Sequence, residues 1–127
     1  MPVMIWLWIG VGGALGAMAR HGVSVVTHAR YGADPFPVGV LVVNVLGCLL
    51  AGLIAGLLAS ARLHLPPEAR TLLMVGLLGG FTTFSAFGVD TFTLLHSGHY
   101  ATAALNVIAQ VGLTLVAVWV GFALASA

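Results

Sequence analysis

Residues 79–87 read Gly-Gly-Phe-Thr-Thr-Phe-Ser-Ala-Phe and lie in an apolar segment with no charge between Arg70 and Asp90. Two adjacent glycines followed by two β-branched threonines are unfavourable inside a helix. In a bilayer, a helix break is tolerated only where the freed backbone groups meet protein, water or an ion. The stretch therefore predicts a transmembrane helix that is broken near Gly79–Thr83, and it marks the expected working site.

Apolar residues dominate the rest of the chain as well. Its 127 residues are 61% hydrophobic and 6% charged, with no lysine. About 20 apolar residues cross a bilayer as a helix, and four segments are long enough, at about residues 3–26, 36–61, 68–95 and 100–125. We expect an all-α membrane protein with a single four-helix transmembrane domain over residues 1–127. The net charge of +1 with no basic cluster excludes nucleic-acid binding.

The few arginines are evenly divided between the two predicted membrane faces. Arg62 and Arg70 fall on one face, and Arg20 and Arg30 fall on the other. An excess of positive charge on one side normally sets the orientation of a membrane protein. Without that excess the chain is expected to insert both ways, which predicts an antiparallel homodimer.

Neutral polar side chains lie within the spans. Asn44 lies deep in the second span, and the third span contains the hydroxyls of Thr82, Thr83 and Ser85. The fourth span has a polar residue at every fourth position: Thr102, Asn106, Gln110 and Thr114. One interpretation is hydrogen bonding between helices, worth about 0.6 kcal/mol per contact. The other, which the regular stripe favours, is a path whose uncharged donors partly replace the hydration shell of a small anion.

The aromatic residues and the break suggest two further features of such a path. Phe84 and Phe87 share one helix face, and their ring edges carry positive partial charge that would suit an anion, although most such rings are simply core. Carbonyls freed near Gly79 and Thr82 predict a sodium site, as in other discontinuous membrane helices. Arg20 either concentrates anions at a vestibule or extends to the lipid headgroups.

Other reactive side chains predict no chemistry. Asp90 is interpreted as marking the membrane interface, and Cys48 as a small apolar core residue. The histidines are expected at or beyond the span ends, without the spacing of metal ligands. No nucleophile and base share an enclosed pocket, so an enzyme is not expected.

Three motifs make the chain similar to a known family, the Fluc-type fluoride channels. They are GALGAMAR at 13–20, GVLVVN at 39–44, and the stretch 79–87. The resemblance covers nearly the whole chain. It implies a bacterial plasma-membrane protein that forms a dual-topology, antiparallel dimer with two pores and exports fluoride passively.

The resemblance also implies roles for matching residues. Asn44 resembles the asparagine that donates a hydrogen bond to the ion. Phe84 and Phe87 resemble the pair of rings whose edges face fluoride. Ser85 and Thr114 resemble members of a polar track along the pore.

Three further positions match structural features of the family. The carbonyls of Gly79 and Thr82 resemble ligands of a central sodium ion, and Arg20 resembles a vestibule arginine. Five residues depart from the usual pattern: Ala86, Asp90, Asn106, Gln110 and Val118. The resemblance implies the same fold and ion class despite these changes, and it implies that the polar track of the fourth span differs from that of relatives.

Two alternatives remain open at the level of sequence. A small multidrug transporter shares the length, span number and dual topology. Proton-coupled export needs a buried carboxylate, however. The first, second and fourth spans have none, and Asp90 lies late in the third span, which argues against this alternative. A non-transporting assembly subunit would use Asn44 and Thr114 for packing only.

Overall fold

The computed structural model describes residues 2–127, with the side chain of Pro2 left out of the description, and contains no strand within that range. In chain order the elements are α1 (Pro2–Tyr31), α2 (Val38–Ala59), α3 (Pro67–Thr71), the π-helix η1 (Leu72–Leu78), α4 (Gly79–Phe81), α5 (Phe84–His96) and α6 (Tyr100–Ser126). Four helical segments are long and apolar enough to cross a membrane: Val3–Tyr31, Val38–Ala59, Pro67–His96 and Tyr100–Ser126. The predicted all-helical protein with four spans is therefore confirmed.

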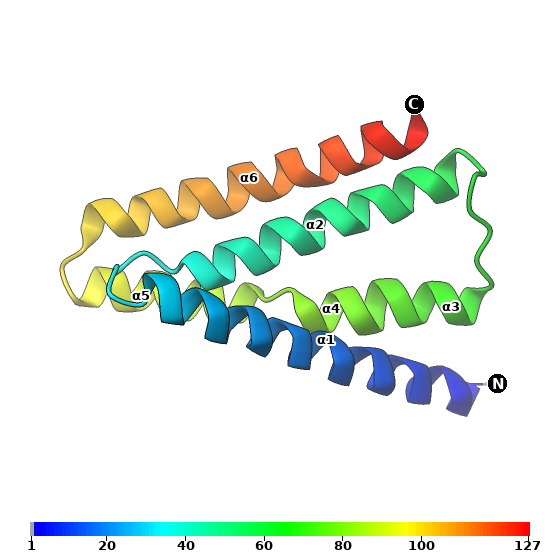
Figure 1. Cartoon of the computed structure of the whole chain (residues 1–127), viewed down its shortest axis with the longest axis horizontal. Helices are drawn as coiled ribbons and strands as arrows, with labels where there is room; N and C mark the ends of the chain where they lie inside the picture. Colours follow the sequence, from blue (N-terminus) through cyan, green and yellow to red (C-terminus); the bar gives the residue numbers. More distant parts are fainter. Residues whose placement is uncertain (1) are drawn as a thin grey trace.

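The helices form two pairs that run along the long axis of the molecule. Figure 1 shows α2 and α6 side by side, and α1 beside the segment that runs from α3 to α4, with both termini at the same end. α2 packs chiefly on α6, and α1 packs on η1 and α4. α5 leaves that second pair and contacts α6, so it connects the two halves of the bundle.

Glycines allow both helix pairs to approach closely. A Cβ atom on Gly12 would lie 2.7 Å from the carbonyl oxygen of Leu72, and one on Gly16 would overlap the carbonyl oxygen of Leu77. On α2, Gly52 and Gly56 lie equally close to the backbone of α6. These glycines allow the close approach, because any larger side chain would push the helices apart.

The helix ends follow from local chemistry. Pro66 and Pro67 begin α3, as expected for residues whose missing N–H costs nothing in the first turn, and Glu68 lies in that turn. α2 ends before Ala61, whose positive φ of 58° is incompatible with a continuing right-handed helix.

α1 continues to Tyr31, beyond the predicted end of the first span near residue 26. His21 and His28 therefore lie within the helix, whereas the sequence placed them at or beyond its end.

Candidate functional site

Two residues between α4 and α5 have extended backbone. Thr82 has φ −81° and ψ 157°, and Thr83 has φ −150° and ψ 117°. Both are β-branched, which suits extended conformations. The hydroxyl of Thr83 accepts a hydrogen bond from the Ala86 N–H and so caps the start of α5.

Asn44 of α2 holds this extended segment in place. Its Nδ2 donates to the Thr83 carbonyl at 3.0 Å, and its Oδ1 accepts from the Thr83 N–H at 2.8 Å. Both residues are buried, each with 8% of its surface exposed. The side-chain amide thus satisfies backbone groups that a continuous helix would pair internally.

The carbonyls just before and within the extended segment lose their helical donors. The Thr83 N–H, which a continuous α-helix would direct at Gly79, donates to Asn44 instead. The Ala86 N–H, which would pair with Thr82, donates to the Thr83 hydroxyl. The carbonyls of Gly79 and Thr82 are therefore among those that the extended segment leaves without a helical donor, as are the other carbonyls in the last turn before it.

A chain of amide and hydroxyl side chains extends from Asn44 through the bundle. The second Asn44 N–H donates to Gln110 Oε1 at 3.1 Å, and Gln110 Nε2 donates to Asn106 Oδ1 at 3.5 Å. Asn106 Nδ2 donates to the Thr91 hydroxyl at 3.0 Å, and Thr91 donates to the Phe87 carbonyl at 2.8 Å. Asn106 has none of its surface exposed and Gln110 has 4%. Within residues 3–127, no buried side-chain nitrogen or oxygen lacks a partner.

A cavity of about 290 Å³ lies beside this polar chain. Its lining combines polar residues with aromatic and aliphatic side chains: Asn44, Cys48, Thr82, Thr83, Phe84, Phe87, Gln110, Val111, Thr114 and Leu115. None of these side chains carries a full charge at neutral pH. The cavity therefore offers polar groups and aromatic rings to a solute, and no fixed ionic charge.

The two phenylalanines stand together at this cavity. Their ring centroids are 5.3 Å apart and the ring planes are tilted by 53°. Phe84 has 81% of its surface exposed, the highest fraction among the exposed large apolar side chains of residues 3–127. The ring is therefore available to a second molecule or to the membrane interior.

The structure brings most of the predicted site residues to one place but separates others. Asn44, Thr82, Thr83, Phe84, Phe87, Gln110 and Thr114 all line the cavity. Asn106 lies behind it, enclosed within the chain. Ser85 is exposed and shares a hydrogen bond of 3.2 Å with the Thr83 hydroxyl. Sequence reasoning missed Cys48, although its position four residues after Asn44 places both on one face of α2.

Arg20 lines a different cavity, of about 240 Å³, together with His21, Ser24 and Thr83. Thr83 thus separates the Arg20 cavity from the cavity with the phenylalanines. A third and larger cavity, of about 720 Å³, shares His21 and Ser24 with the Arg20 cavity.

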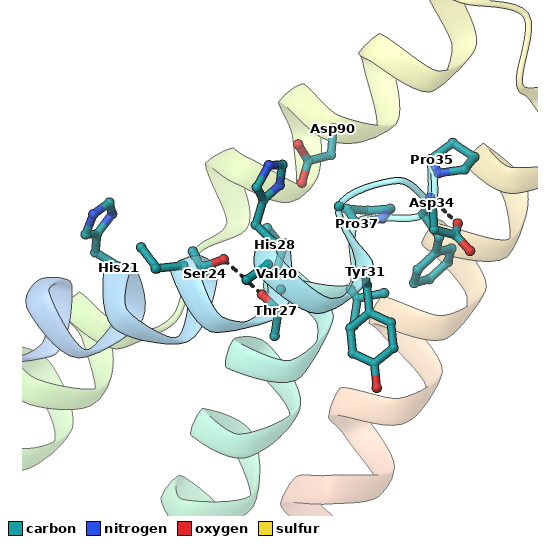
Figure 2. A pocket seen from close by; sticks show the side chains of 16 residues that line it. His21, Ser24, Thr27, His28, Tyr31, Asp34, Pro35, Pro37, Val40 and Asp90 are labelled. Atoms are coloured by element: carbon teal, nitrogen blue, oxygen red, sulfur yellow. Dashed lines mark hydrogen bonds between the residues drawn. The ribbon is translucent and has the colours of Figure 1, made fainter.

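Asp90 lines the largest cavity, although the sequence favoured a simple interface marker. Figure 2 shows its carboxylate facing the imidazole of His28 across that cavity. Among residues 2–127, no group of three or more histidine, cysteine or acidic side chains is arranged to hold a metal ion.

Comparison with known proteins gives a consistent result. The family model described as "CrcB-like protein, Camphor Resistance (CrcB)" matches residues 7–122. A relative from Methylobacillus flagellatus, named fluoride-specific ion channel FluC, is 44% identical over 91% of this chain and 90% of its own length. Proteins of the same name from Paracoccus denitrificans and Coxiella burnetii are 47% and 40% identical, covering 91% and 94% of this chain and 90% and 92% of their own lengths.

Proposed function

This chain belongs to the CrcB-like family, and from that membership we infer that it is a fluoride-specific ion channel. It is a multi-pass membrane protein and a transporter rather than an enzyme. Among its own features, one observation carries the inference: the uncharged cavity where Asn44, Gln110 and the two phenylalanines meet. Neutral donors and ring edges bind a small anion weakly enough to release it.

We propose that fluoride leaves the cytoplasm passively along this cavity. The anion would lose part of its hydration shell to Asn44, Thr83, Gln110 and Thr114, while Phe84 and Phe87 present their ring edges. Ser85, exposed near the start of α5, would extend the polar path at one end. Export would follow the gradient created when HF enters and dissociates in a less acidic interior, across the bacterial plasma membrane.

A second, inverted copy would complete the path. Phe84 is exposed at the cavity, so a partner subunit is needed to enclose an ion there. The balanced arginines, two on each predicted face, favour insertion in both orientations. We therefore propose an antiparallel homodimer, in which each subunit covers the exposed phenylalanine of the other.

The freed carbonyls of Gly79 and Thr82 support a sodium site, because unwound backbone carbonyls of discontinuous membrane helices coordinate sodium. Gly79 is exposed in the single chain, so its carbonyl is open to a partner subunit. We propose that the two carbonyls from each subunit hold sodium between the copies. The ion would join the subunits and place a positive charge near the anion path.

Arg20 is assigned to the vestibule. It lines the cavity on the other side of Thr83, where a fixed positive charge would raise the local concentration of fluoride. Asn106 is assigned a supporting role, because it is enclosed and reaches the path only through Gln110.

Reconstituted liposomes test the function. Vesicles loaded with potassium fluoride and treated with valinomycin should release fluoride rapidly, whereas vesicles loaded with potassium chloride should not. Equal release of both halides would contradict a fluoride channel. Export of a quaternary ammonium dye coupled to a proton gradient would instead support the multidrug alternative. A non-transporting assembly subunit would form dimers and show no halide release.

A further inference from the structure

The polar chain inside the bundle runs in one direction. Each member donates to the next, from Asn44 to Gln110, to Asn106 and to Thr91, and Thr91 donates to the Phe87 carbonyl. In this arrangement both Asn44 N–H groups are used, one by Thr83 and one by Gln110. Asn44 therefore has no free donor for an anion, and Gln110 presents its oxygen, not its nitrogen, toward Asn44.

Three of these side chains, Gln110, Asn106 and Thr91, can form their part of the chain in the opposite direction, while Asn44 stays fixed on Thr83. A carboxamide offers both an acceptor and donors at nearly equivalent positions, and a hydroxyl donates or accepts by rotation. If Asn106 and Gln110 each turn their amide groups over, Thr91 donates to Asn106 and Asn106 donates to Gln110. The Gln110 Nε2 then faces Asn44, and two N–H donors meet at the edge of the cavity that both residues line.

Two donors facing each other are unfavourable unless an acceptor lies between them. A fluoride ion supplies that acceptor, because it is a compact anion that takes several N–H bonds. The forward chain contains four hydrogen bonds. The reversed chain with fluoride also contains four, and the two to the ion are charge-assisted and therefore stronger. The Phe87 carbonyl keeps its helical partner within α5.

We propose that fluoride binding reverses this hydrogen-bond chain, and that Gln110 thereby changes from the acceptor that caps Asn44 into a second donor to the ion. The inference rests on the proposed function and identifies its ion-binding step. The weakest link is the bond of 3.5 Å between Gln110 and Asn106, at the upper limit for such a bond, where reversal would begin. Without fluoride, the forward chain occupies both N–H groups of Asn44. The anion site therefore forms only when fluoride binds and shifts the equilibrium to the reversed chain.

The side-chain amides of ¹⁵N-labelled wild-type protein in detergent micelles give a direct test. Fluoride should shift the NH₂ signals of Asn44, Gln110 and also Asn106, which is enclosed and cannot touch the ion. On fluoride addition, the Asn106 NH₂ should lose its proximity to the Thr91 side chain and gain proximity to Gln110. Chloride should cause none of these changes. A fluoride response confined to Asn44 and Gln110 would overturn the reversal.

The variant Gln110→Met gives an independent test in liposomes. Methionine has similar length but no hydrogen-bonding amide, so fluoride flux should fall about tenfold, as expected for the loss of one bond to a charged group. If Gln110 only competes with fluoride for Asn44, the flux will rise. If it only packs the helices, the flux will not change. Either result overturns the proposal.

The two tests separate this inference from the function itself. Wild-type efflux that distinguishes fluoride from chloride measures the function alone. A conducting wild type without an Asn106 response would overturn the reversal and leave the channel intact. If Gln110→Met does not form dimers, the spectra of the wild-type protein still show whether fluoride reverses the hydrogen-bond chain.

Discussion

Asn44 and Thr83, 39 positions apart in the chain, exchange two hydrogen bonds of 3.0 and 2.8 Å as if both were residues of paired strands. The carboxamide of Asn44 takes the place of a peptide group. It satisfies both polar groups of Thr83 at the point where helical pairing stops. The extended segment between α4 and α5 is therefore maintained by a single side chain from α2.

Asn44→Leu should strongly destabilise the protein, because the N–H and carbonyl of Thr83 lose their partners in a buried site. The cost should be about 2 kcal/mol or more in the free energy of unfolding. Unfolding of the purified protein in mixed micelles, followed by far-ultraviolet circular dichroism, measures it. Asn44→Asp retains an acceptor for the Thr83 N–H but removes the donor to the Thr83 carbonyl and to Gln110, so it should also destabilise the protein. Equal stability of Asn44→Leu and the wild type would contradict this role.

Two threonines of α5 allow the polar chain's contribution to stability to be measured against that of a hydroxyl that bonds only its own helix. Thr91 and Thr93 each donate to the carbonyl four residues earlier, at 2.8 and 2.9 Å. Only Thr91 also accepts the Asn106 amide, at 3.0 Å. Thr91→Val should therefore reduce the free energy of unfolding by about 1 kcal/mol or more, whereas Thr93→Val, on the exposed side, should change it little. Similar free energies of unfolding for the two variants would show that the hydrogen bond from Asn106 to Thr91 does not stabilise the protein.

The same comparison is available for glycine. A Cβ atom on Gly52 would overlap the Val118 carbonyl of α6, whereas one on Gly112 meets nothing within 4 Å. Gly52→Ala should force α2 and α6 apart and cost about 1–3 kcal/mol. Gly112→Ala should be neutral or slightly stabilising, because alanine favours helix. Thermal unfolding of both variants checks the difference, and a stable Gly52→Ala would show that the helices separate easily.

Part of this architecture was predictable from sequence because hydropathy and glycine spacing act locally. The four spans follow from the runs of apolar residues, and glycines four residues apart, as at 12/16 and 52/56, are spaced for close helix contact. The polar residues of the fourth span do not all face the same cavity, although the sequence predicted one continuous stripe. Residues four apart turn by about 400°, so each step rotates the stripe by about 40°. Asn106 consequently lies inside the chain while Gln110 and Thr114 reach the cavity.

Other features depend on partners that are distant in sequence. The π-helix η1 has no simple local pattern, and its wide turns accompany close contact with the glycines of α1. Asn44 was identified as polar and deep, but its bonds to Thr83 require α2 and the extended segment to be adjacent. The sequence likewise gave no indication that Arg20 and the phenylalanines line separate cavities.

The only cysteine of the chain tests whether the cavity conducts. Cys48 is half-buried and lines the cavity beside Asn44. A bulky methanethiosulfonate attached there should reduce fluoride efflux from liposomes more than tenfold by filling a space of about 290 Å³. Cys48→Ala should conduct and be insensitive to the reagent. Unchanged efflux from protein whose modification is verified by mass spectrometry would show that the ion takes another route.

Phe84→Ile tests the role of the ring edge. The side chain is 81% exposed in the single chain, so its replacement should leave the fold of the subunit intact. Isoleucine keeps apolar bulk but has no positive ring edge, and fluoride efflux should fall by at least tenfold. Phe92→Ile is the matched control, because Phe92 lies on the same helix, is 66% exposed and does not line the cavity. If both variants conduct like the wild type while remaining dimeric, the aromatic edge has no part in conduction, and the hydrogen-bond donors of Asn44 and Gln110 must account for the path alone.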